Sequence, residues 1–180
     1  MSLAPRILPN YSYEDYLRWE GRWEIIDGIA YDMSPMARPD HQEIASNLSW
    51  VFTSAIKASK CSFCKVYQPI DLKISENNIV NPDLLIVCKK IEGQYLDTPP
   101  ELVVEIISPS SKLKDRYTKS DLYQKFGIKY YILIDPSVRS IEVFSLNEQG
   151  EYDIRLESTS FELSDHCLIH PDLSLIWPEE

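Results

Sequence analysis

The sequence has no long apolar stretch. Its longest apolar runs, Leu84–Cys88 and Tyr130–Ile134, have the length of a strand, whereas a helix that crosses a bilayer needs about 20 such residues. The first seven residues lack the charged start and the apolar segment of a secretion signal. We therefore expect a cytoplasmic protein with no membrane partner.

Cysteine is scarce as well. Four cysteines in 180 residues are too few for a disulfide scaffold, which favours a reducing compartment and unpaired thiols. A structural zinc site is an alternative, because Cys61 and Cys64 have a spacing that suits tetrahedral zinc, and three later residues could add ligands. These residues are His166, Cys167 and His170.

Positive charge is in short supply too. The chain has 18 Lys and Arg against 28 Asp and Glu, a net charge of −10, and a pI near 4.8. This argues against a protein that binds nucleic acid through a basic surface alone. It does not argue against an enzyme that binds phosphate through a bound cation. The 44% of hydrophobic residues excludes a disordered chain, and the length predicts a single domain over residues 1–180.

The apolar pattern predicts an α/β fold. Helices are expected over Tyr11–Trp19, from Pro39-Asp40 onward, and from Ser108–Ser111 to Phe126. Strands are expected over Cys64–Ser75, Leu84–Cys88, Glu101–Ser108 and Tyr130–Ile134, with hairpins over Trp23–Tyr31 and over Ser140–Leu146 with Tyr152–Glu157. Near-continuous apolar strands beside amphipathic helices indicate a mixed central sheet that is buried on both faces.

Glu105 is the most informative residue, because it stands inside the apolar run Leu102–Ile107. On a strand, Val103, Glu105 and Ile107 share one face. An unpaired carboxylate there would lose its hydration without compensation. Glu105 must therefore have a cation, hydrogen-bond donors or a wet cleft beside it, and a structural ion pair is the alternative.

Asp83 stands at the start of the preceding apolar strand. Since neighbouring strands lie about 4.8 Å apart, Asp83 and Glu105 could share one divalent cation, and all-oxygen ligation suits Mg²⁺ or Mn²⁺. Taken alone, Asp83 could equally be a turn residue.

Lys119 is expected to point at the same place. It recurs at helical spacing with Asp115, Leu122 and Phe126, which directs it toward the sheet. The alternative is an ordinary Asp115–Lys119 pair on the helix surface. Two weaker candidates are Glu24, which could be a solvated hairpin side chain, and His41, which could be a histidine at the edge of the core.

The sequence resembles the Uma-two family of endonucleases. The matching segments follow one another along most of the chain: Trp23–Gly28, Ser34-Pro35 with His41, Pro82–Val87, Pro100–Pro109, Asp115–Lys119 with Tyr123, and Gly127–Pro136. The resemblance implies the restriction-endonuclease-like fold, an αβββαβ core, here with an extra hairpin at each end.

The resemblance also implies a metal-dependent active site. That superfamily has Pro-Asp, then Asp or Glu, any residue and Lys; Asp83 and Glu105 match the two metal-binding acids, but Ile107 stands where the Lys is expected. Lys119 would supply the missing ammonium from the helix. Glu24 matches a further acidic residue that could join the metal ligands, and His41 the family's histidine.

The implied function is hydrolysis of phosphodiester bonds in nucleic acid, with DNA the expected substrate, Mg²⁺ or Mn²⁺ the cofactor and a homodimer the expected assembly. The alternative, because Lys is absent at position 107, is a nuclease fold that binds but does not cleave. On this hypothesis Lys119→Ala should leave the fold largely intact and lower the cleavage rate.

Overall fold

The computed structural model describes residues 8–33, 38–108, 113–155, 160–164 and 167–178. Four features of the sequence lie outside these residues. They are the Ser34-Pro35 motif, the start of the second long helix at 109–112, the end of the strand predicted over Tyr152–Glu157, and His166.

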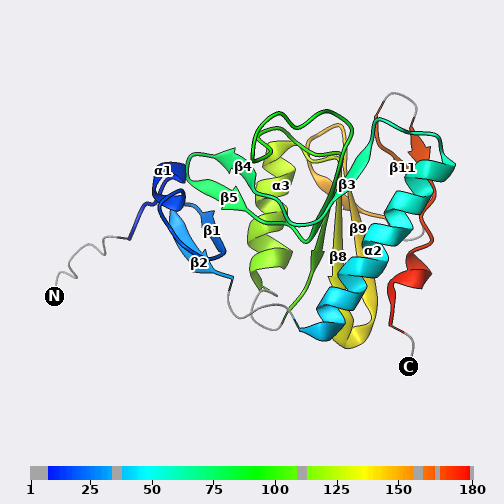
Figure 1. Ribbon diagram of the computed structural model, residues 1–180, viewed down its shortest axis with the longest axis horizontal. Coiled ribbons are helices and arrows are strands. Elements are labelled where there is room, and N and C mark those ends of the chain that lie inside the picture. The colour runs from blue at the N-terminus through cyan, green and yellow to red at the C-terminus, as the bar shows by residue number, and fades with distance from the viewer. Residues whose placement is uncertain (1–7, 34–37, 109–112, 156–159, 165–166, 179–180) are drawn as a thin grey trace.

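A mixed six-stranded sheet forms the centre of the molecule (Figure 1), in the order β10-β9-β8-β7-β6-β3. Its strands are β3 (Lys65–Tyr67), β6 (Leu84–Val87), β7 (Leu102–Ile106), β8 (Tyr130–Asp135), β9 (Ser140–Leu146) and β10 (Tyr152–Ile154). Strands β7 and β8 are parallel, and the other neighbours are antiparallel. The α/β class and the mixed sheet predicted from the apolar pattern are confirmed.

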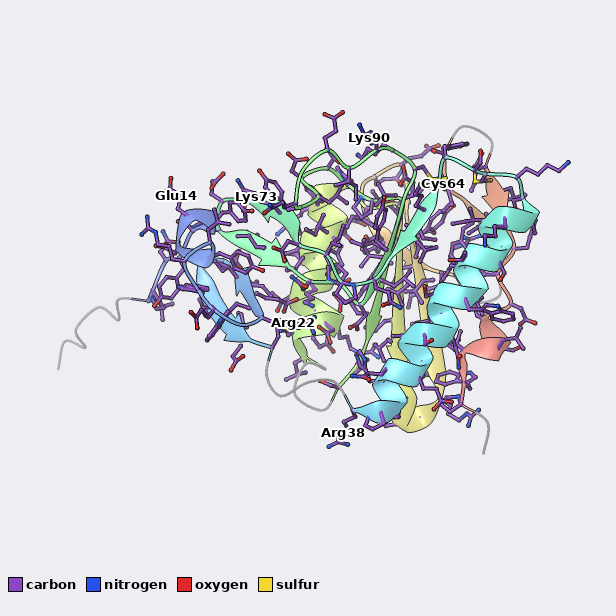
Figure 2. The ribbon with its side chains drawn as sticks, viewed as in Figure 1. Glu14, Arg22, Arg38, Cys64, Lys73 and Lys90 are labelled. Carbon is purple, nitrogen blue, oxygen red and sulfur yellow. A yellow bond between two sulfur atoms is a disulfide. The ribbon has the colours of Figure 1, made fainter. Side chains whose placement is uncertain are left out.

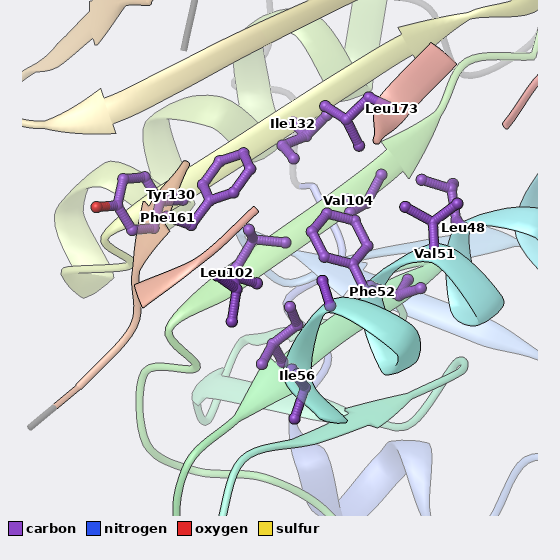
Figure 3. Close-up of a cluster of buried hydrophobic side chains, with 14 of the residues drawn as sticks. Leu48, Val51, Phe52, Ile56, Leu102, Val104, Tyr130, Ile132, Phe161 and Leu173 are labelled. Carbon is purple, nitrogen blue, oxygen red and sulfur yellow. The ribbon is translucent and has the colours of Figure 1, made fainter. Parts of the chain in front are cut away.

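Helices cover the two faces of this sheet (Figure 1). Helix α2 (Pro39–Ala58) packs on one face, where its apolar residues meet Leu102 and Val104 of β7 (Figure 3). On the other face lies a π-helical segment, η1 (Lys114–Lys119), which continues directly into α3 (Ser120–Phe126). Because side chains alternate along a strand, Val103 and Glu105 of β7 point the other way, toward η1 and α3.

A second sheet of four short strands adjoins α3 (Figure 1), in the order β2-β1-β5-β4. Its strands are β1 (Trp23–Ile26), β2 (Ile29–Asp32), β4 (Leu72–Ser75) and β5 (Asn78–Val80), and the short helix α1 (Tyr13–Tyr16) precedes them. Ile26, Leu72 and Val80 share a buried cluster with Leu122 of α3. This sheet therefore carries Glu24 of β1 to the α3 side of the central sheet.

The single strand predicted over Cys64–Ser75 is wrong. The segment divides into β3, which pairs with β6 in the central sheet, and β4, which pairs with β5 in the small one. Pro69 lies between them, and proline cannot donate a hydrogen bond to a ladder. The continuous apolar pattern hides a change of sheet.

The C-terminal residues pack against α2. They form β11 (Phe161–Glu162), β12 (Leu168–Ile169) and the 3₁₀ turn η3 (Leu173–Ile176), and a further 3₁₀ turn, η2 (Pro136–Val138), follows β8. Phe161 and Ile176 are buried in the α2 cluster. Within the described residues, no helix is both long and apolar enough to span a membrane.

All four cysteines are paired, as Cys61–Cys167 and Cys64–Cys88. The expectation of unpaired thiols is therefore wrong, and the cysteine count no longer argues for a reducing compartment. Composition could not show that folding gathers these residues. Cys64 and Cys88 flank the paired strands β3 and β6 on the same side, and the β11–β12 hairpin brings Cys167 to the end of α2.

Candidate active site

Glu105 lies in a buried polar cluster on the α3 side of β7. Its side chain is 4% exposed. The Lys119 ammonium of η1 donates to Oε1 of Glu105 at 2.9 Å, and the Tyr123 hydroxyl of α3 donates to the same oxygen at 2.5 Å. The carboxylate in the apolar run thus has the cation and hydrogen-bond donors that its position demands.

Lys119 is the centre of this cluster. Its side chain is 2% exposed, and Nζ lies 2.6 Å from Oε1 of Glu24, 2.9 Å from Oε1 of Glu105 and 3.5 Å from Oδ1 of Asp115. Lys119 ends the π-helical segment, a geometry that is rare and frequent at functional sites. The structure thus joins both alternatives for Lys119: it pairs with Asp115 and also reaches Glu105.

Glu24 closes the cluster from the small sheet. It is fully buried on β1, and its two oxygens accept from Lys119 and, at 2.6 Å, from Lys114. Oε1 also accepts from the backbone N–H of Asn81 at 3.0 Å. Glu24 is therefore no solvated hairpin residue. It ties η1 to the loop that leads into Asp83.

Asp83 directly precedes β6, which pairs with β7 in antiparallel orientation. Leu84 pairs with Val104, so Asp83 and Glu105 are the next residues beyond this pair on the two segments, and the charge of Asp83 acts on Glu105. Oδ2 of Asp83 accepts from the backbone N–H of Ile106 at 2.8 Å and lies 3.3 Å from Nε2 of His41 on α2. His41 thus contacts the candidate site from the opposite layer.

Asp83 and Glu105 each make their hydrogen bonds and ion pairs through one of their two carboxylate oxygens. Among the described residues, the hydrogen bonds and ion pairs of Glu105 end on Oε1 and those of Asp83 on Oδ2, which leaves Oε2 and Oδ1 for a ligand. In the described part of the chain, no group of three or more His, Cys, Asp and Glu side chains could hold a metal ion. Two carboxylates nevertheless fit Mg²⁺, which keeps several waters and is commonly held by one or two carboxylates.

The pKa values of the two buried glutamates, Glu105 and Glu24, are shifted in opposite directions. Burial raises the pKa of Glu105 well above its usual range, because Lys119 offsets this only in part and Asp115, Asp83 and Glu24 add to it. Burial also acts on Glu24, but there Lys119 and Lys114 outweigh it and lower the pKa. Glu105 therefore lies where an added positive charge would be favourable.

Lys119 and His41 hold their protons more tightly than usual. Burial lowers the pKa of the Lys119 ammonium, but three carboxylates outweigh it and raise that pKa well above its ordinary value. Burial likewise lowers the pKa of His41, and its contact with Asp83 outweighs this and raises it. The acids thus favour the protonated forms of the two groups that contact them.

Sequence reasoning missed several members of the cluster. In the sequence Tyr123 is only part of a motif, and a tyrosine at helical spacing is typical of a core residue, which Tyr123 also is. Nothing in the sequence indicates that Lys114 reaches Glu24. Ile107, at the expected lysine position, packs in the apolar cluster with Leu122.

Residues 13–176 match the model of the Uma2 family, which is described as "Putative restriction endonuclease". The chain belongs to the Uma2 family. An uncharacterized protein of Synechocystis sp. (strain ATCC 27184 / PCC 6803 / Kazusa) is 31% identical over 173 residues, which cover 87% of this chain and 88% of the relative. The Uma-two resemblance seen in the motifs is confirmed.

The fold agrees with a solved structure. The crystal structure of a protein from Anabaena variabilis ATCC 29413, titled a putative nuclease belonging to DUF820, matches with a TM-score of 0.71. The match covers 92% of this chain and 96% of the other, at 17% identity. At that identity the likeness concerns the fold. Membership of the Uma2 family is what points to a nuclease.

Proposed function

We propose that this Uma2 protein is an Mg²⁺- or Mn²⁺-dependent nuclease that hydrolyses phosphodiester bonds, with DNA as its substrate. The observation that carries the proposal is that Asp83 and Glu105 adjoin the paired residues Leu84 of β6 and Val104 of β7. The charge of Asp83 acts on Glu105, and each acid has one oxygen held by donors. In this proposal Oδ1 of Asp83 and Oε2 of Glu105 hold the cation. A bound divalent cation polarises a phosphate oxygen and lowers the pKa of a bound water.

The chain's own residues would orient this site. Lys119 and Tyr123 fix Oε1 of Glu105, and the Ile106 N–H and His41 fix Oδ2 of Asp83. Held groups need no reorganisation when charge develops in the transition state. The Lys119 ammonium, beside Glu105, would stabilise that negative charge.

Glu24 takes a positioning role in this proposal rather than the role of a metal ligand. Both of its oxygens already accept from lysine ammonium groups. By holding Lys119 on one side and the Asn81 N–H on the other, it keeps η1 and the Asp83 loop at a fixed separation.

Asp83→Asn and Glu105→Gln test this proposal. Each variant removes one charged ligand and nearly keeps the side-chain shape, so cleavage of DNA with Mn²⁺ or Mg²⁺ should fall by about 10²-fold or more. Cleavage by the parent chain should stop when the metal is chelated. The matched control is Asp121→Asn, because Asp121 is an exposed acid on α3 whose ion pair is with the exposed Lys125.

The proposal fails if Glu105→Gln cleaves like the parent. A second candidate is a nuclease fold that binds metal and nucleic acid without cleaving, which the buried Ile107 favours. In that case calorimetry should detect Mn²⁺ binding that Asp83→Asn abolishes, while no DNA or RNA is cut. RNA tested in parallel separates the two nucleic acids.

A further inference from the structure

The four cysteines of the chain form one group of sulfur atoms. They come from four places in the chain. Cys61 follows the end of α2, Cys64 directly precedes β3, Cys88 directly follows β6, and Cys167 directly precedes β12. Besides the two disulfides, Sγ of Cys64 lies 3.8 Å from Sγ of Cys167. The two pairs are therefore one contiguous four-sulfur cluster, which Figure 2 locates by its label on Cys64.

We propose that the reduced chain binds one Zn²⁺ through Cys61, Cys64, Cys88 and Cys167. Zinc–sulfur bonds of about 2.3 Å place the sulfurs of a tetrahedral site about 3.8 Å apart, which is the separation of Cys64 and Cys167 across the two disulfides. This ligand set replaces the one suggested by the sequence. Cys88 joins it, and His170, which is exposed, does not.

The backbone around the cluster is already in place for such a site. Cys61 and Cys64 share a tight turn in which the Cys64 N–H donates to the Cys61 carbonyl at 3.0 Å. The Cys167 N–H donates to the Ser164 carbonyl at 2.8 Å. Cys88 is held by its N–H, which donates to Glu101 at 2.8 Å. Ligands fixed in this way lose little freedom on binding.

The surroundings suit a zinc–thiolate centre. Cys61, Cys64 and Cys167 lie at the edge of the α2 core with 4%, 4% and 2% exposure. A surface pocket lined by Cys88 together with Lys65, Lys89 and Lys90 gives access from solvent. Four thiolates around Zn²⁺ leave two negative charges, and the three lysines that line the pocket with Cys88 carry charge of the opposite sign.

The conversion needs a reductant. In the disulfide form the sulfurs are bonded in pairs, and the described residues of this form contain no group of three or more His, Cys, Asp and Glu side chains that could hold a metal ion. A low-molecular-weight thiol supplies the electrons: two thiol molecules reduce one protein disulfide and leave as one disulfide of their own, so four thiol molecules reduce both. Zn²⁺ then displaces the four thiol protons to solvent.

The zinc centre would join distant parts of the chain. It would tie the β11–β12 hairpin to the α2–β3 turn and to β6, which are the contacts that the two disulfides make in the oxidised chain. Its role is structural, because four protein ligands leave no open position. The centre is independent of Asp83 and Glu105 and requires no nuclease activity.

Zinc binding by the reduced full-length chain tests this inference. After reduction with excess thiol and its removal without oxygen, Zn²⁺ is added, and native mass spectrometry counts the bound metal. One Zn²⁺ per chain is expected, with all four thiols protected from alkylation until a chelator is added. Absence of bound zinc, or immediate alkylation of the four cysteines in its presence, would overturn the proposal.

Two variants test the ligand set. Cys88→Ser should weaken zinc affinity, measured by competition with a chelator, by more than the about 10²-fold that loss of a residue behind a ligand can cost. Replacement of Zn²⁺ by Co²⁺ should give thiolate charge-transfer absorption that this variant reduces. The control, His170→Ala, should bind like the parent. A zinc affinity that falls in His170→Ala but not in Cys88→Ser contradicts the proposed site.

Discussion

At the scale of single residues, the burial of Lys119 makes this side chain important for the stability of the fold as well as for the candidate site. Its ammonium is enclosed by Glu24, Glu105 and Asp115. Removing one partner of a buried ion pair leaves an uncompensated charge in the interior, which is strongly destabilising. The structure thus revises the expectation that Lys119→Ala would leave the fold largely intact.

Lys119→Met should lower the free energy of unfolding by about 3–5 kcal/mol. The methionine keeps most of the volume of the side chain, so the loss reports the missing charge rather than a cavity. Urea denaturation followed by circular dichroism measures it. Lys125→Met is the control, because Lys125 is exposed and pairs with Asp121 at the surface, and it should change stability by less than about 0.5 kcal/mol.

A Lys119→Met chain as stable as the parent would contradict a buried ammonium among three acids. The double variant Lys119→Met with Glu105→Gln should recover part of the loss, because a neutral amide in place of the Glu105 carboxylate needs no counter-charge. Nuclease assays on Lys119→Met belong at temperatures where circular dichroism finds it folded, so that lost activity and lost structure are not confused.

Glu105 and Lys119 could be predicted from the sequence because each breaks an apolar pattern. A carboxylate inside Leu102–Ile107 demands a partner, and helical spacing supplies one. Tyr123 breaks no apolar pattern, since tyrosine is a common residue in protein cores. Its hydrogen bond to Glu105 depends on how β7 and α3 pack together, which spacing along one element does not contain.

At the scale of elements, the same contrast holds. The hairpin predicted over Trp23–Tyr31, the start of α2 at Pro39 and the end of α3 at Phe126 follow from local chemistry and are found where predicted. The division of Cys64–Ser75 between two sheets is a long-range outcome. It depends on the pairing of β3 with β6 and of β4 with β5, and each half alone is an equally good strand.

Gly28 offers a test of the turn that follows Glu24 and β1. Its φ is +74°, and an added Cβ would lie 2.9 Å from Cα of Asn10 and also clash with the Asn10 side chain. Gly127 has a φ of +86° but no atom within 4 Å of such a Cβ. The positive φ should lower the free energy of unfolding of both alanine variants by about 1 kcal/mol. Only in Gly28→Ala does the new Cβ also clash with the backbone of Asn10.

Gly28→Ala should therefore lower the melting temperature by more than Gly127→Ala does, as measured by differential scanning calorimetry. Equal shifts in the two variants would mean that the contact with Asn10 carries no stability. The comparison isolates tertiary packing, because the local conformational cost is shared.

At the scale of the whole molecule, we expect a homodimer. The chain has a mass of 20.9 kDa, and light scattering at micromolar concentrations should give twice that value. Most soluble oligomers are symmetric, and two-fold dimers are by far the commonest. A monomer mass across the whole concentration range would contradict the expectation. The net charge of −10 makes moderate salt the suitable condition, because salt screens repulsion between subunits.

The parallel pairing of β7 with β8 has a consequence for how such a site can change during evolution. Two parallel strands cannot be joined by a tight turn, so the chain must cross back over one face of the sheet. Here η1 and α3 make that crossing, and they pass over Glu105 on the way. A crossing is compulsory for this topology, and in this chain it is helical and contacts the acid through Lys119 and Tyr123. A lineage can therefore exchange a strand lysine for a helix lysine by point substitutions, with the fold unchanged throughout.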